Sequence, residues 1–367
     1  MAKKILWIFG YTENSGYARN SREWIKGLNA AGMETRFLVH EGAKDYPDMP
    51  EMKPFESYVG YEYDLVIHNV IPPCFDRKAD YFPRETKHIL MTVAETDSVS
   101  ESWVNKCNEA DEVWTMSYFS KMAFVHSGVS VPVEITLMPI DIERIRNSKS
   151  DSFRFHKDPG AFVFFANSEW TPRKGWDILL EAYFHAFQND PNVSLIIKTC
   201  CFSGVDNFNS MRNMIEMFKY EKKSQARVFL IADIIPAEDV WFLYKSADCY
   251  VLPTRGEGCG IPYLEALACG VPVIAPDRGG QVDYILPGTG QLIKSQLKPA
   301  CRFPHNPNYN ESMLWIQTDI NELVKSMIDH RYNSVRYQDK SGFANFDATF
   351  GHGGTEVMKT IQRIEAL

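Results

Sequence analysis

The segment PTRGEGCGIPYLEALACGVPVIAP, residues 253–276, carries the pattern around which the rest of the chain is organised. The apolar run CYVLP leads into it and predicts a strand that ends at Pro253. Three glycines, Gly256, Gly258 and Gly260, then alternate through a tight loop. Because glycine has no Cβ, such a loop can adopt positive φ angles and bring its backbone close to a ligand.

A short predicted helix, YLEALAC, follows the glycine loop, and VPVIAP resumes as a buried strand. Pro262 suits the first helical turn, since its missing N–H would be unpaired there, and Gly270 is typical of a helix end. Free N–H groups and the helix dipole converge at such a helix start, which makes it a site for anions. Two carboxylates frame it, Glu257 in the loop and Glu265 in the helix. The alternative is an ordinary strand–turn–helix with surface glutamates.

This segment resembles the donor-site motif of retaining glycosyltransferases with the GT-B fold, specifically glycosyltransferase family four (glycosyl transferases group 1). The family pattern is two glutamates separated by seven residues around a Gly-aromatic-Gly-aliphatic-Pro core. Here the pattern is EGCGIPYLE, from Glu257 to Glu265, and Cys259 takes the place of the usual aromatic residue. The ACGVPVIA run that follows strengthens the resemblance.

The resemblance implies a role for each residue of the motif. Glu265 would bind the ribose hydroxyls of a nucleoside diphosphate sugar, and Glu257 would hold its sugar ring at the reacting centre. Whether Glu257 is a nucleophile stays open, because the leaving group itself could accept the acceptor's proton on the same face. Backbone N–H groups around the donor would come from Gly258, Cys259, Gly260 and Ile261.

Two adjacent cations, Arg173 and Lys174, stand at the start of a helix predicted after the strand AFVFFAN. A cation is mildly unfavourable there unless an anion lies between it and the positive end of the helix dipole. The resemblance implies the same, since the family's arginine and lysine bind the donor diphosphate. The family often has its arginine several residues earlier, where Ser168 and Glu169 stand here, so Arg173 is interpreted as a shifted substitute. A solvated surface pair is the alternative.

The first residues also predict a nucleotide-binding type of domain. The strand KKILWIFG, a loop, a helix from about Arg19 and the strand METRFLVH form the opening of a doubly wound sheet. The motif G-x-G-x-x-G is absent, which disfavours a dinucleotide. The resemblance implies that the loop Asn14–Ser15–Gly16–Tyr17 contributes Gly16 to donor binding and Tyr17 to the sugar and acceptor side. A simple tight turn is the alternative.

Further acceptor-side candidates follow two predicted strands. His68 and Asn69 lie at the carboxyl end of YDLVIHN, where open α/β sheets bind ligands. The family frequently has a histidine there, although a satisfied structural histidine is the alternative. Many relatives have another histidine after the next strand, HILMTVA, but this chain has none there. Glu95 is the best polar group at that place, with a loop carboxylate as the alternative.

Length and motifs together predict the α/β class with the GT-B fold, two Rossmann-like domains facing each other across a cleft. We expect an acceptor-side domain over 1–145, a nucleotide-sugar donor domain over 146–335, and a C-terminal helix over 336–367 that packs back towards the first domain. The run from Leu286 to Tyr309 contains prolines and predicts an irregular insertion.

Composition excludes several other classes of protein. The 367 residues carry a net charge of −8, which argues against a broadly basic nucleic-acid surface. No secretory leader is expected, and no apolar run reaches the ~20 residues of a membrane helix. The eight cysteines are scattered without a C-x-x-C pair, so we expect reduced thiols, no metal site and a cytoplasmic protein. Peripheral contact with a membrane through Arg19, Arg22 and Lys26 is the alternative location.

The predicted reaction moves a hexose or related sugar from a UDP or GDP sugar to an acceptor, with retention of configuration. No D-x-D motif stands in a suitable strand-end loop, so we expect no metal and no cofactor beyond the co-substrate. A glycan, a lipid-linked sugar, a protein, a nucleic-acid base or a small molecule would each fit as acceptor. A non-catalytic nucleotide-sugar-binding protein and a sugar-nucleotide epimerase of the same fold are the alternatives.

Overall fold

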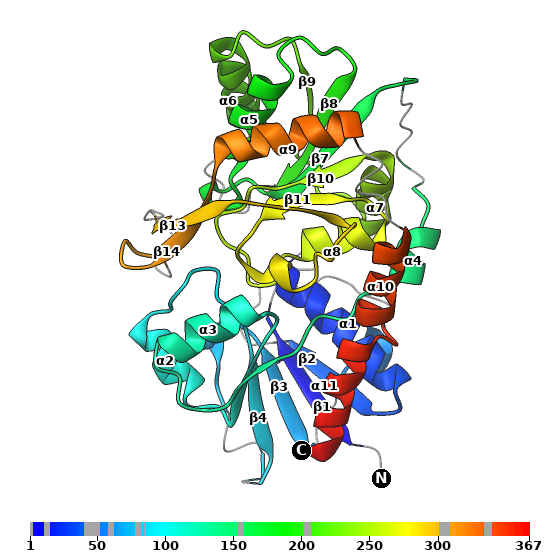
Figure 1. The fold of residues 1–367 in the computed structure, drawn as a ribbon. Helices are drawn as coiled ribbons and strands as arrows, with labels where there is room; N and C mark the ends of the chain where they lie inside the picture. Colours follow the sequence, from blue (N-terminus) through cyan, green and yellow to red (C-terminus); the bar gives the residue numbers. More distant parts are fainter. Residues whose placement is uncertain are drawn as a thin grey trace. The chain divides into compact units, whose positions relative to one another are not determined.

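A computed structural model describes residues 3–10, 15–39, 52–57, 62–77, 82–83, 85–150, 152, 158–200, 207–300, 309–333 and 340–367. Within them the chain forms two compact units, each built on a parallel sheet covered by helices (Figure 1). This confirms the predicted α/β architecture of two Rossmann-like domains. Asn14, in the first predicted loop, lies outside the described residues.

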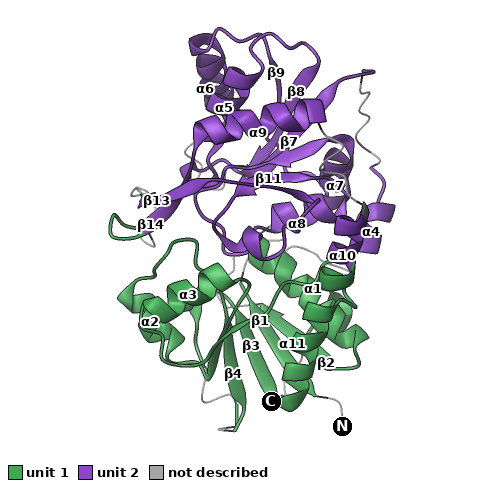
Figure 2. Ribbon diagram, in the orientation of Figure 1, with its two compact units in different colours: residues 1–141, 300–313, 348–367 green, residues 142–299, 314–347 purple. Residues whose placement is uncertain are grey.

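The two units are assembled from several chain segments (Figure 2). Unit 1 comprises Met1–Asp141, Ala300–Met313 and Ala348–Leu367, and unit 2 comprises Ile142–Pro299 and Leu314–Asp347. The sequence predicts domain boundaries at residues 145 and 335. It does not predict that the chain returns to unit 1 at Ala300–Met313. Two contacts hold that segment in unit 1: Tyr309 donates a hydrogen bond to Glu95, and the hydroxyl of Thr96 lies 3.9 Å from the sulfur of Met313.

Unit 1 contains a six-stranded sheet of order β2-β1-β3-β4-β5-β6, in which every neighbouring pair is parallel. Parallel sheets are covered on both faces, which explains why the inner strands are nearly continuous apolar runs. The strands are β1 (Lys4–Phe9), β2 (Glu34–Val39), β3 (Leu65–Asn69), β4 (Lys87–Met91), β5 (Glu112–Thr115) and β6 (Val133–Ile135).

Helix α1 (Gly16–Ala30) begins three residues before the predicted start near Arg19, because Ser15 caps it. The Ser15 hydroxyl accepts a hydrogen bond from the backbone N–H of Ala18 at 3.1 Å, which satisfies one of the free donors of the first turn. The remaining elements of unit 1 are η1 (Lys53–Phe55), η2 (Pro72–Cys74), α2 (Glu101–Cys107), α3 (Tyr118–His126) and α11 (Thr355–Ala366).

The C-terminal helix α11 packs on the sheet of unit 1. Its buried residues Val357, Ile361 and Ile364 belong to the same apolar cluster as Trp7 of β1 and Ile25 of α1. Burying an aliphatic side chain of this kind stabilises a fold by about 1.5–3 kcal/mol relative to leaving it exposed. The last helix is therefore an integral layer of the unit that contains the first strand.

A partly buried ion pair attaches α1 to the turn before α11. Nε2 of His352 lies 2.9 Å from Oε2 of Glu23. Burial by itself would lower the pKa of His352, but the hydrogen bond and charge of Glu23 raise it above its ordinary 6.5. Burial would raise the pKa of Glu23, but the hydrogen bond and charge of His352 hold it below its ordinary 4.5.

These shifts predict a stability that depends on pH. The raised pKa of His352 contributes stability that is fully present below pH 6.5 and is lost as pH rises through the folded-state pKa. The lowered pKa of Glu23 contributes stability that is present above pH 4.5 and is lost as pH falls through the folded-state pKa. We expect His352→Gln to destabilise the protein at about pH 5.5, and the difference to shrink towards about pH 8.5. Urea unfolding at the two pH values measures it, with exposed His126→Gln in the same unit as the control. A wild-type advantage that grows with pH would contradict the prediction.

Unit 2 contains a second six-stranded sheet, of order β12-β11-β10-β7-β8-β9, again with parallel neighbours. Strand order reverses between β7 and β10, and such a switch point is where open α/β sheets bind ligands, beyond the carboxyl ends of the strands. The strands are β7 (Phe162–Glu169), β8 (Val193–Cys200), β9 (Arg227–Ile231), β10 (Cys249–Val251), β11 (Val273–Pro276) and β12 (Gly290–Ile293).

The predicted irregular insertion from Leu286 to Tyr309 contains two strands, so that prediction was wrong. One is β12, and the other is β13 (Ser295–Pro299), which pairs antiparallel with β14 (Leu314–Thr318). Neither strand shows a clean period in the sequence, and each is stabilised by pairing with another strand, β12 with β11 and β13 with β14. The helical elements of unit 2 are α4 (Ile142–Asn147), η3 (Pro172–Lys174), α5 (Trp176–Ala186), α6 (Phe208–Glu221), α7 (Ala237–Ser246), α8 (Ile261–Ala268), η4 (Gly280–Asp283) and α9 (Ile320–Asn333), and α10 (Lys340–Phe350) crosses the boundary.

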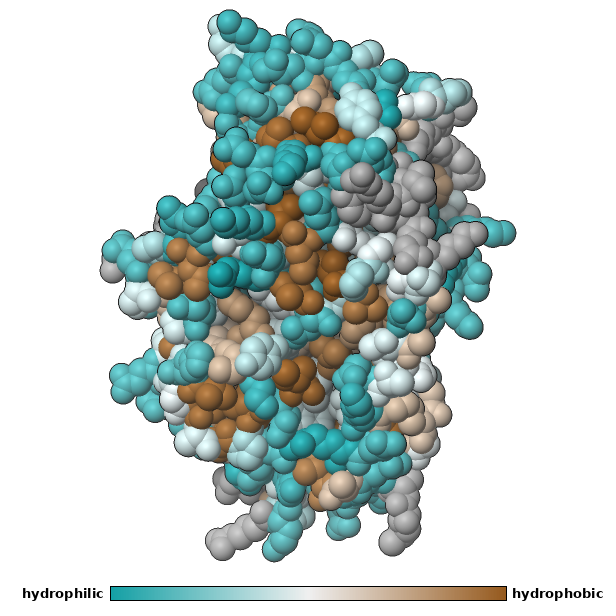
Figure 3. Space-filling view, in the orientation of Figure 1, coloured by the Kyte–Doolittle hydropathy of each residue, from teal (hydrophilic) through white to brown (hydrophobic). Residues whose placement is uncertain are grey.

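The surface of unit 2 around α6 is mainly hydrophilic in the view of Figure 3. Met211 and Ile215, four residues apart on α6, are buried against the sheet, as a helix with one apolar face requires. No helix among the described residues is long and apolar enough to cross a lipid bilayer.

Candidate functional site

The turn between β7 and α5 presents the first two predicted site residues, Arg173 and Lys174. Pro172 opens the short helix η3, and Gly175 ends it with φ +70° before α5 begins. A Cβ on Gly175 would lie 2.1 Å from the carbonyl oxygen of Pro253, just beyond β10. Only glycine accommodates this approach, so the cationic turn lies directly on the end of the neighbouring strand.

The glycine loop after β10 enters α8 as the sequence predicts. Gly260 caps the helix with φ +84°, and a Cβ there would lie 2.8 Å from the hydroxyl of Tyr284. That hydroxyl donates to the carbonyl oxygens of Gly260 at 2.6 Å and of Cys259 at 2.9 Å. Burial raises the pKa of the Cys259 thiol far above its ordinary value, so the residue that replaces the family's aromatic is an inert, buried group. Ile261 follows as the first residue of α8.

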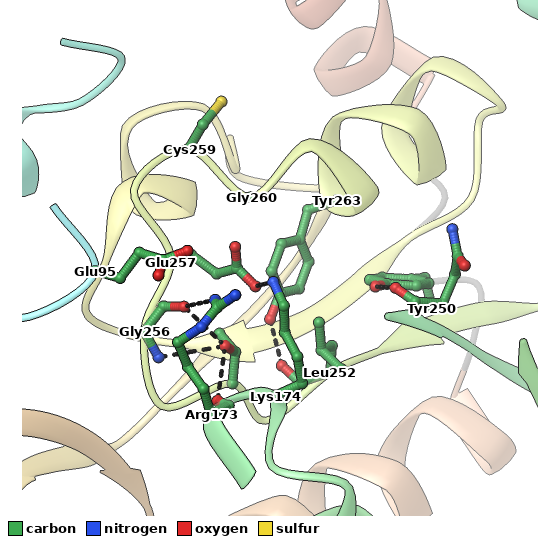
Figure 4. A network of polar contacts seen from close by, with 12 residues as sticks. Glu95, Arg173, Lys174, Tyr250, Leu252, Gly256, Glu257, Cys259, Gly260 and Tyr263 are labelled. Carbon is green, nitrogen blue, oxygen red and sulfur yellow. Dashed lines mark hydrogen bonds and ion pairs between the residues drawn. The ribbon is translucent and has the colours of Figure 1, made fainter. Parts of the chain in front are cut away.

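The two segments meet through a buried ion pair, shown in Figure 4. Nζ of Lys174 lies 2.5 Å from Oε1 of Glu257, and the two residues are 9% and 5% exposed. Nη1 of Arg173 donates to the carbonyl oxygen of Gly256 at 2.7 Å. The structure thus brings together Arg173, Lys174 and Glu257 at the switch point between β7 and β10. Two cations and one carboxylate converge on the loop that leads into α8.

A second ion pair, which the sequence did not reveal, attaches the two turns to each other. Nη1 and Nη2 of Arg255 donate to the two carboxylate oxygens of Asp177, at 2.8 and 2.7 Å. The backbone N–H of Arg255 also donates to the carbonyl oxygen of Arg173 at 2.6 Å. Bidentate arginine–carboxylate pairs are geometrically specific, so this contact positions Arg173 and Lys174. No local pattern could have indicated a pairing across 78 residues.

Glu265 is almost completely buried under helix α7. Its carboxylate accepts hydrogen bonds from Nε1 of Trp241 at 3.0 Å and from the hydroxyl of Tyr244 at 3.4 Å. Sequence reasoning missed both donors. Trp241 and Tyr244 are three residues apart on α7, so their side chains lie on the same face of the helix. That spacing of two aromatic residues with hydrogen-bonding groups is the sequence signal that could have identified them. The two contacts hold the carboxylate in one orientation.

In unit 1, the structure brings Gly16, Tyr17 and Asn69 together at the start of α1. Nδ2 of Asn69, at the end of β3, donates to the carbonyl oxygen of Tyr17 at 3.1 Å and to the hydroxyl of Ser21 at 2.8 Å. The hydroxyl of Tyr17 lies 3.1 Å from that of Thr92, just beyond β4. The carboxyl ends of two strands and a helix start therefore form one polar cluster, in which Gly16 is the first helical residue.

His68 does not belong to this cluster. Side chains alternate across a strand, so His68 points to the opposite face of the sheet from Asn69. It is 1% exposed, and its Nε2 lies 3.1 Å from Nδ1 of His88. Burial, and then the charge of Arg77, lowers the pKa of His88 to about 4. The geometry of His68 is that of the structural alternative, an interior histidine with a polar partner.

Glu95 lies in the loop after β4 and is partly exposed. Its carboxylate accepts a hydrogen bond from Tyr309, so it is placed by the segment that returns to unit 1. Within the described parts of the chain, no group of three or more His, Cys, Asp or Glu side chains is arranged to hold a metal ion.

Comparison with known proteins finds a family that part of the chain matches. Residues 147–300 match the family described as Glycosyl transferases group 1. A GDP-mannose-dependent alpha-(1-6)-phosphatidylinositol monomannoside mannosyltransferase from Mycolicibacterium smegmatis is 30% identical over 198 residues, which cover 51% of this chain and 50% of that protein. The chain therefore spans about half the length of this curated relative.

Two solved structures share the architecture of almost the whole chain. Sucrose-phosphate synthase from Thermosynechococcus elongatus superposes with a TM-score of 0.71 at 16% identity, covering 99% of this chain and 98% of that one. The Anabaena protein HepE, in a complex with UDP-glucose, superposes with a TM-score of 0.70 at 17% identity, covering 99% of this chain and 100% of its own. At these identities the likeness shows the fold, which is GT-B.

Proposed function

We propose that this chain belongs to the glycosyl transferases of group 1 and moves a hexose or related sugar from a nucleoside diphosphate sugar to an acceptor. The observation that carries the proposal is the buried Lys174–Glu257 pair at the switch point of the second sheet. Nη1 of Arg173 donates to the carbonyl oxygen of Gly256 in the same loop, which leads into α8. This arrangement suits a dianionic diphosphate next to a polyhydroxyl sugar.

The chemical difficulty of the proposed reaction is the charge on the departing diphosphate. A helix dipole supplies at most ~2 kcal/mol, whereas each charge-assisted hydrogen bond contributes about 1.5–3 kcal/mol. Lys174 and Arg173 would therefore supply the larger electrostatic stabilisation of the transition state. We propose metal independence for the same reason, because two cationic side chains stand where the charge of a metal ion would act.

In the proposed step, the bond between the anomeric carbon and the diphosphate oxygen breaks, and a bond from that carbon to the acceptor oxygen forms on the same face. The acceptor's proton passes to the departing diphosphate oxygen, and the configuration of the sugar is retained. Lys174 would exchange part of its contact with Glu257 for the diphosphate. Glu257 would then accept hydrogen bonds from sugar hydroxyls, and Glu265 would accept those of the ribose.

The named relative supports a nucleotide-sugar donor, and its lipid-linked acceptor is the first class to try with this chain. The polar cluster of Tyr17, Asn69 and Thr92 in unit 1, with Glu95 nearby in sequence, is proposed to serve the sugar and acceptor side. We propose action in the cytoplasm, with peripheral contact with a membrane if the acceptor proves to be lipid-linked.

A thermal-shift panel with UDP, GDP, ADP, CDP and their sugar conjugates tests the donor site. Ligand at about 100 times its Kd stabilises the folded state by ~2.7 kcal/mol, so we expect a clear rise in Tm with at least one nucleotide. Glu265→Gln should weaken the binding of that nucleotide by about tenfold, since a neutral side chain replaces a charged hydrogen-bond acceptor. Glu216→Gln, on the exposed side of α6, should bind like the wild type.

Turnover assays separate the proposed transfer from its alternatives. Release of free nucleoside diphosphate when a suitable acceptor is present supports the transferase. An intact nucleotide–sugar bond after turnover would indicate an epimerase, and tight binding without turnover on any acceptor a binding protein. If folded wild-type protein gains no stability from any nucleotide, the donor site is assigned wrongly.

A further inference from the structure

Lys198 is a buried cation that the proposed mechanism does not use. It lies near the carboxyl end of β8 and is 6% exposed. Its ammonium donates to the carbonyl oxygen of Thr199 at 2.9 Å. No carboxylate among the described residues lies within ion-pair distance of it. An ammonium has three N–H donors, so two of them have no acceptor in the described part of the chain.

The register of the sheet shows which groups Lys198 accompanies. It is paired with Asn167 on β7, so the two side chains share the face on which α7 lies. Nδ2 of Asn167 donates to the hydroxyl of Tyr244 at 3.2 Å, and that hydroxyl donates to Glu265 at 3.4 Å. A row of polar groups therefore runs from Glu265 through Tyr244 and Asn167 to Lys198. Neighbouring strands lie ~4.8 Å apart, and this spacing separates Asn167 on β7 from Lys198 on β8.

The surroundings of Lys198 favour an uncharged oxygen as its ligand. Burial lowers the pKa of Lys198, and the charges of Cys200 and Asp233 only partly oppose this shift. Asp233 itself is exposed to solvent. A buried donor without acceptors costs free energy that any hydrogen-bonding ligand oxygen would recover. A carbonyl oxygen has lone pairs that can accept a hydrogen bond from the donors left without acceptors.

We propose that Lys198 selects the nucleobase of the donor by donating a hydrogen bond to a ring carbonyl oxygen. This inference rests on the proposed function, because it takes Glu265 as the ribose ligand and Lys174 as the diphosphate ligand. The base is attached to the ribose and would extend along the polar row, away from the diphosphate. Uracil and guanine carry a keto oxygen where cytosine and adenine carry an amino group. Lys198 therefore makes the site specific for a UDP or GDP sugar.

Binding constants for UDP, GDP, ADP, CDP and inorganic pyrophosphate test the inference in the full chain. The wild type should bind UDP or GDP about ten- to a hundredfold more tightly than ADP, the range of one hydrogen bond to a charged group. Lys198→Met should remove that preference and leave ADP and pyrophosphate unchanged. Lys325→Met, an exposed lysine on α9, is the matched control and should behave as the wild type.

Two further variants keep the test decisive if Lys198→Met does not fold. Lys198→Arg retains the donors and should retain the preference for a keto base. Lys198→Gln offers an amide oxygen that can accept a hydrogen bond from the amino group of adenine. This variant should therefore bind ADP more tightly relative to UDP and GDP. Three results would overturn the role of Lys198. They are tighter binding of ADP than of UDP and GDP by the wild type, an equal loss of affinity for all ligands including pyrophosphate in Lys198→Met, and unchanged affinities in every variant. A wild type that binds no nucleotide at all would instead contradict the proposed function.

Discussion

Replacing Lys174 by alanine should lower the turnover of the nucleotide sugar by about 10²–10³-fold. This is the effect of removing one preorganised group that stabilises charge in a transition state. Lys174 is 9% exposed, so water cannot substitute for its ammonium as it would at a surface. Release of nucleoside diphosphate under saturating donor measures the loss, because saturation removes the contribution of weaker binding.

The same substitution should also destabilise the fold. It leaves Glu257, which is 5% exposed, without its partner, and breaking a buried ion pair in this way costs about 3–5 kcal/mol. Replacing both residues, as Lys174→Met with Glu257→Gln, should restore most of the stability without restoring turnover. The control is Lys222→Ala, which removes a half-exposed pair with Glu181 and should change stability by less than about 1 kcal/mol. Folded Lys174→Ala with turnover within about threefold of wild type would refute the electrostatic role.

Gly175→Ala should strongly destabilise the fold of unit 2. The new Cβ would lie 2.1 Å from the carbonyl oxygen of Pro253, a backbone atom that cannot move independently. Left-handed backbone costs an alanine ~1–2 kcal/mol, and forced overpacking costs about 1–3 kcal/mol more. Urea unfolding should therefore show a loss of about 2–5 kcal/mol. Donor binding should weaken in the folded fraction, because Lys174 shifts with the turn.

Gly270→Ala provides a matched control for this prediction. Gly270 has φ +75°, close to the +70° of Gly175, but a Cβ there would meet nothing within 4 Å. It should show the strain of ~1–2 kcal/mol alone, with donor binding unchanged. If the two variants lose equal stability, the clash of the new Cβ with Pro253 adds nothing to the loss. The close contact of the cationic turn with the end of β10 would then not explain why residue 175 is glycine.

The sequence by itself determined the local parts of the fold and of the candidate site. The glycine spacing and Pro262 predicted the loop and the start of α8, because backbone conformations of glycine and proline are intrinsic to those residues. Apolar runs predicted the strands of two parallel sheets, since strands covered on both faces need apolar side chains throughout. The adjacent cations at 173 and 174 likewise indicated an anion before any contact was known.

Only the tertiary structure decided which groups meet. Lys174 and Glu257 are 83 residues apart, and their contact follows from the reversal of strand order between β7 and β10. Neighbouring residues His68 and Asn69 separate onto opposite faces because the backbone of β3 alternates. The strands β12 and β13 form where the sequence predicted an insertion, since a strand is stabilised by a partner that local sequence does not specify. Pairing between distant segments, which no short window of sequence contains, is the physical reason for the ion pair and for the two strands, whereas the separation of His68 and Asn69 follows from the alternation along β3.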